Sequence, residues 1–318
     1  MVQPKTRWFL LAVTCCVVPL MAQEQGPIFI QLWGSQGSGF EQFNAPEGVA
    51  VSQDDTVFVA DTGNHRIQVY DDQGVFVRRW GQPGVEEGRF NTPEGIAVGS
   101  DGFVYVADSG NHRIQMFDQG GNFIRSWGSE GSELGQLNLP VGIALDGDGS
   151  IFVADVMNHR VQVFDRFGNF LRAWGSQGSG VGQFQFPAGI AVDINGNVYV
   201  ADNNNHRVQK FSNDGEYLLR WGSLCNVGTG EGCAAPQGEG QFNLPFGIAA
   251  GKDGLIYVTD QGNGRVQMFD PKGEFLGAWG QPGAEPRQFA SPKGIALSDS
   301  GYIFIADSDN HRIQMFQR

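Results

Sequence analysis

The sequence has few cysteines, few basic residues and no long helical pattern. Its 318 residues include four Cys and five His, and 21 Lys and Arg stand against 34 Asp and Glu, a net charge of -13. Phosphate binding by counterion release needs clustered Lys and Arg, so we expect neither nucleic acid nor an anionic membrane surface as a partner. Beyond residue 22, no long segment keeps apolar residues at i, i+3, i+4 and i+7, which argues against long amphipathic helices.

The one long apolar run lies at the N-terminus. Two basic residues precede an apolar segment at residues 8–21, which is short for a membrane-spanning helix. The segment ends in Leu-Met-Ala, so we expect residues 1–22 to be a signal peptide cleaved after Ala22, and the product to be secreted or periplasmic. An uncleaved anchor, or a lipid on Cys15 or Cys16, is the alternative. Cleavage removes two basic residues and no acidic ones, which changes the net charge to -15.

Two cysteines, Cys225 and Cys233, remain after that cleavage. In an oxidising compartment an even pair at this spacing predicts a disulfide. Two thiols with no histidine nearby do not indicate a metal site.

A twelve-residue pattern recurs along the chain. Residues 107–118, Ala-Asp-Ser-Gly-Asn-His-Arg-Ile-Gln-Met-Phe-Asp, have close copies at 60–71, 154–165, 201–212, 259–270 and 306–317. Four of the histidines follow one another at 47 residues, and Gly264 replaces the histidine in the fifth copy. Six copies over most of the chain predict one array of repeats.

Turn residues divide each repeat into four short strands. In residues 90–128 the first two strands are apolar runs typical of buried strands, and the third and fourth alternate apolar and polar residues. Four successive antiparallel strands form one blade, and six blades arranged radially predict an all-β, six-bladed β-propeller. The six tryptophans outside the signal all occupy the same fourth-strand position, which favours a role in the core.

The predicted domain is a single propeller over residues 27–318. Its sixth repeat stops before a fourth strand, and residues 27–34 match the fourth strand of the second repeat, so we expect the N-terminal strand to complete the sixth blade and close the ring. The expected blades are 43–81, 90–128, 137–175, 184–222, 242–280, and 289–318 with 27–34.

The repeat pattern resembles the NHL repeat family. The motif Asn-His-Arg-Ile/Val-Gln follows a Val-Ala-Asp strand, and Phe-Asn-x-Pro-x-Gly-Ile-Ala precedes it. The resemblance covers about residues 27–318 and implies a six-bladed propeller. It implies no single activity, because the family includes protein-binding modules, sensor ectodomains, RNA-binding domains and an amidating lyase.

An acidic and a basic residue recur at a spacing of five in every copy. A reaction centre needs one arrangement, whereas a scaffold needs all six, so we interpret these residues as structural framework. They are Asp61, Arg66, Asp108, Arg113, Asp155, Arg160, Asp202, Arg207, Asp260, Arg265, Asp307 and Arg312.

No residues are left over for a catalytic centre. All five histidines belong to the repeated pattern, so none is free to act as a lone general base or to cluster on a metal. Serine, threonine and cysteine likewise lack a histidine placed to activate them. We therefore expect no catalytic residue, metal site or cofactor.

The copies differ at the middle of the Pro-x-Gly turn, where the lyases of the resembled family place metal-binding histidines. If the first strands lead to the axis, these residues surround the mouth of the channel, and we expect any recognition to use them. This candidate binding ring consists of Glu47, Glu94, Val141, Ala188, Phe246 and Lys293.

The sequence favours an exported, non-catalytic propeller that binds a protein, peptide or glycan, and we expect a monomer. The linker between Gly222 and Pro245 is 11 residues longer than the others and contains Cys225 and Cys233. Propeller loops often carry function, so this insertion also points to a partner site. The alternative is a propeller enzyme, a lyase or lactone hydrolase, with a divalent metal held at the channel mouth by carboxylates such as Glu47 and Glu94.

Overall fold

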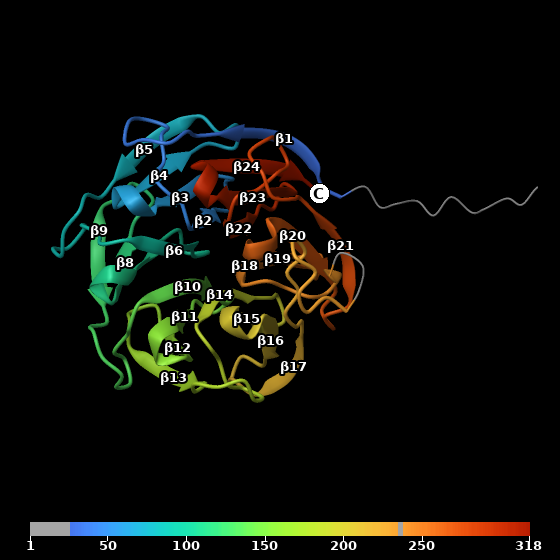
Figure 1. Ribbon diagram of the computed structural model, residues 1–318. Helices are drawn as coiled ribbons and strands as arrows, with labels where there is room; N and C mark the ends of the chain where they lie inside the picture. The colour runs from blue at the N-terminus through green and yellow to red at the C-terminus, as the bar shows by residue number, and fades with distance from the viewer. Residues whose placement is uncertain (1–25, 235–237) are drawn as a thin grey trace, which may run out of the picture.

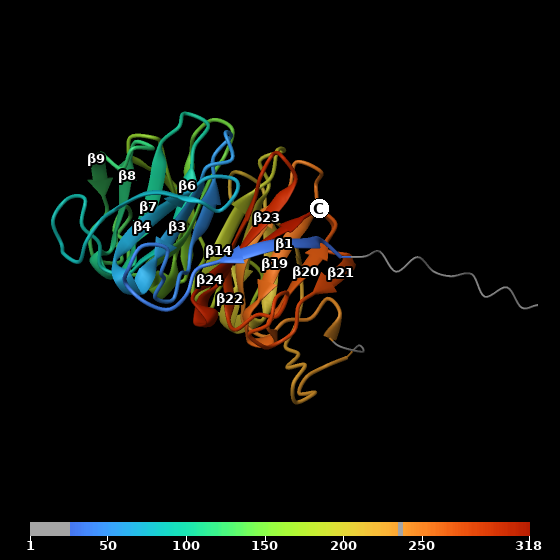
Figure 2. The same ribbon diagram turned by 90° about the horizontal axis from the view of Figure 1, so that it is seen from above.

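The computed structural model describes residues 26–234 and 238–318, and the predicted signal peptide lies outside this part of the chain. Six four-stranded antiparallel sheets surround a central axis, so the chain is a six-bladed β-propeller (Figure 1). The side view shows the sheets standing as a ring of blades (Figure 2).

Each blade runs from an inner strand at the axis to an outer strand at the rim. Blades 1 to 3 comprise β2 (Val49–Val51), β3 (Val57–Asp61), β4 (Arg66–Tyr70), β5 (Phe76–Trp80); β6 (Pro93–Val98), β7 (Val104–Asp108), β8 (Arg113–Phe117), β9 (Phe123–Trp127); and β10 (Pro140–Leu145), β11 (Ile151–Asp155), β12 (Arg160–Phe164), β13 (Phe170–Trp174).

Blades 4 to 6 repeat this order, except that the rim strand of blade 6 comes from the other end of the chain. They comprise β14 (Pro187–Val192), β15 (Val198–Asp202), β16 (Arg207–Phe211), β17 (Tyr217–Trp221); β18 (Pro245–Ala250), β19 (Ile256–Asp260), β20 (Arg265–Phe269), β21 (Phe275–Trp279); and β22 (Pro292–Leu297), β23 (Tyr302–Asp307), β24 (Arg312–Gln317), β1 (Ile28–Trp33).

The N-terminal strand closes the ring, as the sequence predicts. β1 pairs antiparallel with β24, with Phe29 opposite Phe316 and Trp33 opposite Ile313. The Trp33 ring lies 5.7 Å from that of Tyr70 in blade 1 and 6.1 Å from that of Phe304 in blade 6, measured between centroids. β1 therefore joins the two ends of the chain and also packs blade 6 against blade 1.

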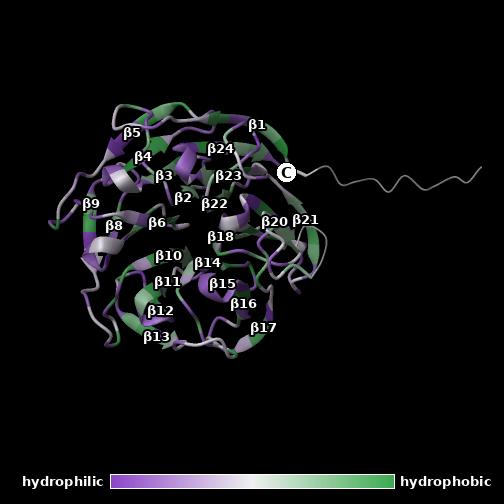
Figure 3. Cartoon of the chain, in the orientation of Figure 1, coloured by the Kyte–Doolittle hydropathy of each residue, from purple (hydrophilic) through white to green (hydrophobic). Residues whose placement is uncertain are grey.

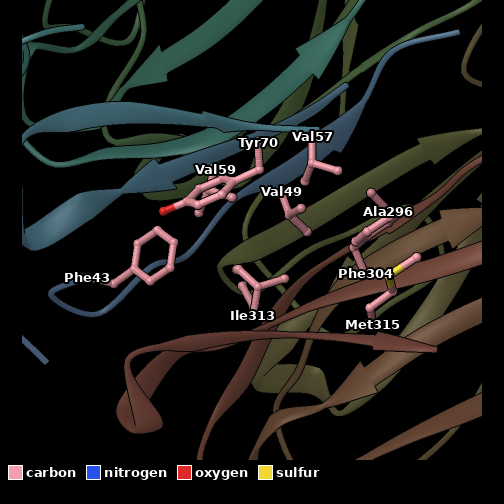
Figure 4. Close-up of a cluster of buried hydrophobic side chains, with 10 residues drawn as sticks. Phe43, Val49, Val57, Val59, Tyr70, Ala296, Phe304, Ile313 and Met315 are labelled. Carbon is pink, nitrogen blue, oxygen red and sulfur yellow. The ribbon is translucent and has the colours of Figure 1, made fainter. Parts of the chain in front are cut away.

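The hydrophobic core is divided into six clusters, one between each pair of neighbouring blades. Figure 4 shows the cluster at the closing seam, where Val57, Val59 and Tyr70 of blade 1 face Phe304 and Met315 of blade 6. Hydrophobic segments recur along the strands around the whole ring (Figure 3). Burial of these apolar faces between blades is the main source of stability for the ring.

The third strand differs from the sequence-based expectation. Its alternating polar residues predict one solvent-exposed face, yet β4 is buried at all five positions, including Arg66 and Gln68. Alternation between partly buried and exposed residues is seen instead in the fourth strand, for example β5. The polar side chains of the third strand are buried because they bond to the linker that enters the blade, as described below.

Candidate functional site

The Pro-x-Gly glycines bring neighbouring blades into close contact at the axis. A Cβ on Gly95 would lie 1.9 Å from the carbonyl oxygen of Val141, and one on Gly48 would lie 2.1 Å from that of Glu94. The equivalent glycine of every blade approaches the next blade's carbonyl in this way. No larger residue fits at such a distance, so these positions require glycine. The variable middle residues are consequently held on a tight backbone ring.

A cavity of about 70 Å³ lies at the centre of this ring. Glu47, Glu94, Val141 and Phe246 line it, whereas Ala188 and Lys293 do not. Aliphatic residues that follow the glycines line it as well: Val49, Ile96, Ile143, Ile190, Ile248 and Ile295. Four of the six predicted ring residues therefore meet at one site. The space suits the head of a side chain rather than a whole drug-sized ligand.

The charged residues of the ring lie on adjacent blades. Lys293 Nζ donates a hydrogen bond of 2.6 Å to Glu47 Oε1, and both side chains are mostly buried. The same ammonium lies 5.2 Å from the centroid of the Phe246 ring, within the range of a cation–π contact. Blades 5, 6 and 1 thus place an ammonium between an aromatic face and a carboxylate.

Glu94, on blade 2, is the second carboxyl group of the mouth. Burial, reinforced by the nearby charge of Glu47 and a hydrogen bond with it, raises the pKa of Glu94 to about 8, while Lys293 acts in the opposite direction. Its neighbour on the far side, Val141, is apolar. Glu94 therefore favours its protonated form at neutral pH, mainly because burial disfavours the charged carboxylate.

Thr259 supports this corner of the mouth from the second strand of blade 5. Its Oγ1 donates to the carbonyl oxygen of Lys293 at 2.7 Å and accepts the N–H of Gly247 at 2.7 Å. Sequence reasoning missed Thr259, although the other five repeats have alanine at this position. The substitution fixes the backbone of Lys293 against blade 5.

These donors do not suit a divalent metal. In residues 26–234 and 238–318, no group of three or more His, Cys, Asp or Glu side chains lies close enough together to hold one. Glu47 is engaged by Lys293, and burial favours the protonated form of Glu94. A metal site needs deprotonated ligands that are free to coordinate, and usually three or more from the protein.

The long linker between Gly222 and Pro245, which we call the cysteine loop, lies on the same face of the propeller as the channel mouth. Cys225 and Cys233 form the predicted disulfide. Asn263, in the turn between β19 and β20, donates to the carbonyl oxygen of Cys225 and accepts the N–H of Val227. Asp260, at the end of β19, pairs with Pro245 at the start of β18, so the turn between β19 and β20 lies on the same face as the Pro-x-Gly residues of the mouth. The loop in gold projects from the ring in Figure 2.

The repeated Asp and Arg form a buried brace in each blade. In blade 1, Arg66 Nε donates to Asp61 Oδ2 at 2.6 Å, and Asn64 and Gln68 donate to the same carboxylate. The aspartate is fully buried and the arginine is nearly so in all six blades. The ion pairs are thus not the exposed kind that contributes little.

The brace ties each blade to the linker that enters it. Arg66 donates to the carbonyl oxygens of Ser38, Gly39 and Gln42, and Asp61 Oδ1 accepts the N–H of Asn44. Removing one partner would leave a buried charge without its counterion, which costs about 3–5 kcal/mol in such pairs. These residues are therefore occupied in holding the ring.

Comparison with known proteins agrees with this geometry. The model of the family described as "NHL repeat" matches residues 43–70, 90–117, 137–164, 184–211, 242–269 and 289–316. The chain belongs to the NHL repeat family. It is 44% identical over 43 residues to human NHL repeat-containing protein 3, which covers 13% of this chain and 12% of that protein.

Solved structures share the propeller fold at low sequence identity. Virginiamycin B lyase from Staphylococcus aureus has a TM-score of 0.62 and 16% identity, with 91% of this chain and 99% of that one covered. A gluconolactonase from Xanthomonas campestris has a TM-score of 0.63 and 16% identity, with 92% and 96% covered. A Bacteroides thetaiotaomicron protein of unknown function has a TM-score of 0.67 and 20% identity, with 90% and 76% covered. At such identity the likeness concerns the fold alone.

The NHL histidines link neighbouring blades. Each adopts a left-handed backbone conformation, and its Nδ1 accepts an N–H from the residue before the next blade's Pro-x-Gly segment, as His65 does from Thr92 at 3.0 Å. In the fifth repeat Gly264 keeps the conformation, with φ of 60°, and a Gln261–Ser291 side-chain bond joins blades 5 and 6 instead. Each of the five histidines is thus engaged in structure.

Proposed function

We propose that this chain is an exported, non-catalytic binding scaffold whose recognition surface is the face that carries the channel mouth and the cysteine loop. One observation carries the proposal: the positions at which the NHL repeats disagree converge on this face. Glu47, Glu94, Val141 and Phe246 line one cavity, Lys293 contacts two of them, and the inserted loop lies on the same side. The repeated charged residues are engaged within the blades, which leaves the variable ones for a partner.

The size of the mouth supports a surface-binding role. A cavity of about 70 Å³ receives one side chain or one sugar substituent, while the rest of a protein, peptide or glycan would lie across the face. The disulfide and the predicted signal peptide are compatible with an extracytoplasmic location. No helix in the described residues is long and apolar enough to cross a membrane.

Libraries of immobilised peptides and glycans, screened with the purified propeller, test this proposal. The mouth variant combines Glu47→Gln, Glu94→Gln, Phe246→Ala and Lys293→Met. The loop variant replaces residues 223–241 with the sequence of residues 129–136, the ordinary linker of blade 3. We expect ligands of the native protein to lose at least about tenfold in affinity for one or both variants.

Two results would count against the scaffold. Ligands that bind both variants as tightly as the native protein would place recognition elsewhere. A stoichiometric divalent ion in protein purified without chelators, removed by EDTA with a fall in melting temperature, would favour a metal-dependent lyase or lactone hydrolase.

A further inference from the structure

The channel mouth already holds an ammonium group, supplied by the chain itself. Lys293 Nζ lies 2.6 Å from Glu47 Oε1 and 5.2 Å from the centroid of the Phe246 ring. A carboxylate on one side and an aromatic face on the other is an arrangement that attracts alkylammonium groups. The side chain of Lys293 is only 18% exposed, so the site holds the ammonium largely away from water.

The channel mouth has two carboxyl groups, and the ammonium group of Lys293 can neutralise the charge of only one of them. Glu47 and Glu94 are two carboxyl groups beside one ammonium, and burial together with the negative charge of Glu47 favours the protonated form of Glu94. The charged groups facing Glu94 are Glu47 and Lys293, since Val141 on the other neighbouring blade is apolar. A second cation would favour the carboxylate form of Glu94 and complete the charge balance.

The cavity beside these carboxyl groups has room for such a cation. Its volume of about 70 Å³ exceeds the 10–15 Å³ or so that one water molecule requires, and Glu47, Glu94 and Phe246 all line it. Apolar walls from residues such as Ile96 and Val141 suit the methylene groups of a lysine stem. The net charge of -13 over the chain would also attract a basic partner over long range.

We propose that the mouth binds a lysine side chain or an N-terminal amine of a basic peptide segment, and that Lys293 competes with this ligand for Glu47. The proposal rests on the binding-scaffold function above and specifies the chemistry of its ligand. The incoming ammonium contacts Glu94 and the cavity wall, and it displaces Lys293 from Glu47 or shares that carboxylate with it. Glu94 releases its proton as the cation enters.

The probe is fluorescently labelled pentalysine, with penta-acetyllysine, pentaarginine and pentaglutamate as comparisons. We expect the native protein to bind pentalysine and, when the N-termini of the comparison peptides are acetylated, to bind neither penta-acetyllysine nor pentaglutamate. Comparison of free and acetylated N-termini separates a terminal amine from a side-chain amine as the source of the ammonium. Equal or tighter binding of pentaarginine would overturn the assignment to an ammonium.

Matched variants separate the mouth from general attraction to an acidic protein. Lys293→Met should tighten pentalysine binding about fivefold to tenfold, whereas Lys252→Met, which breaks an exposed Lys252–Asp299 pair, should change it less than about twofold. Glu47→Gln should weaken binding about tenfold, while Asp148→Asn, an exposed position in the turn between β10 and β11, should leave it nearly unchanged.

Proton release supplies a readout that simple surface attraction does not move. Calorimetry at pH 7 in two buffers of different ionisation enthalpy should show the release of up to about one proton per bound peptide. The Glu94→Gln variant should release no proton. Because the free-state pKa of Glu94 is about 8 and a lysine ammonium stays charged over this range, affinity for a lysine side chain should rise as pH rises from 6 to 8 and then level off.

The inference is overturned if Lys293→Met and Lys252→Met have equal effects, or if Glu94→Gln leaves proton release unchanged. It also falls if the libraries yield a neutral or acidic ligand that depends on the mouth, and in that case the scaffold function stands. Failure of the scaffold itself would appear differently, as library ligands insensitive to both the mouth and the loop variants.

Discussion

Removing the N-terminal strand should destabilise the ring far more than shortening the cysteine loop. Among the described strands, β1 is the rim strand that no hairpin turn joins to its paired strand, because it pairs with β24 while the next strand along the chain is β2 of blade 1. Without residues 27–34, blade 6 loses its rim strand and the cluster between blades 6 and 1 loses Trp33.

The size of the destabilisation can be worked out from Trp33. Truncating a buried tryptophan to alanine costs about 3–5 kcal/mol, and partial burial of Trp33 places it near the lower figure. In a domain of this order of size about 1 kcal/mol shifts the melting temperature by about 2–4 °C, so Trp33→Ala should lower it by roughly 6–12 °C. Deleting residues 27–34 also removes Phe29 and the ladder with β24, and should cost more than about 15 °C.

The comparison variant replaces residues 223–241 with the sequence of residues 129–136. The exchanged linker still offers backbone carbonyl groups to the brace arginine, so we expect the melting temperature to fall by less than about 5 °C. Circular dichroism against temperature measures both variants. Equal shifts for the strand deletion and the loop exchange would refute the closure argument.

A second control isolates closure from the general cost of losing a tryptophan. Trp127→Ala removes the same contacts in blade 2, where the rim strand β9 is covalently joined to β8. The two variants should lose similar stability, but Trp33→Ala alone should speed amide hydrogen exchange in β1 and β24 ahead of the other strands. If exchange rises equally in β8 and β9 of Trp127→Ala, β1 is not a special point of opening.

Three further predictions concern the repeated positions and the loop. His112→Ala should lower the free energy of unfolding by about 1–2 kcal/mol, because alanine is strained in the left-handed conformation and the hydrogen bond to the next blade is lost. His112→Gly should lower it less, because glycine adopts this conformation without strain. Equal losses for the two variants in urea unfolding would contradict this. Gly121→Ala should destabilise by at least about 1 kcal/mol, since φ is 88° and a Cβ would lie 2.6 Å from the tryptophan ring of the preceding blade; an unchanged melting temperature would show that the ring can move. Native protein should show no reactive thiol until reduction exposes Cys225 and Cys233, and thiol titration before reductant checks this.

The sequence by itself determined the architecture, because the repeat carries it six times over. Turn residues divide each copy into four strands, and the match between residues 27–34 and an internal fourth strand reveals how the ring closes. It also indicated where to look for function, since the residue between Pro and Gly changes its chemical character within a motif that is otherwise nearly constant. The close approach of Gly95 to the next blade explains why the motif around that position hardly varies.

Tertiary structure alone decided how polar residues are used. The alternation in β4 predicts an exposed face, but burial of Arg66 and Gln68 depends on carbonyl groups of a linker more than 20 residues earlier, which the local pattern does not encode. Likewise, Lys293 and Glu47 are 246 residues apart and meet only because the ring closes. The raised pKa of Glu94 is likewise a tertiary effect, because its burial and the nearby carboxylate of Glu47 both arise only when the blades pack around the axis.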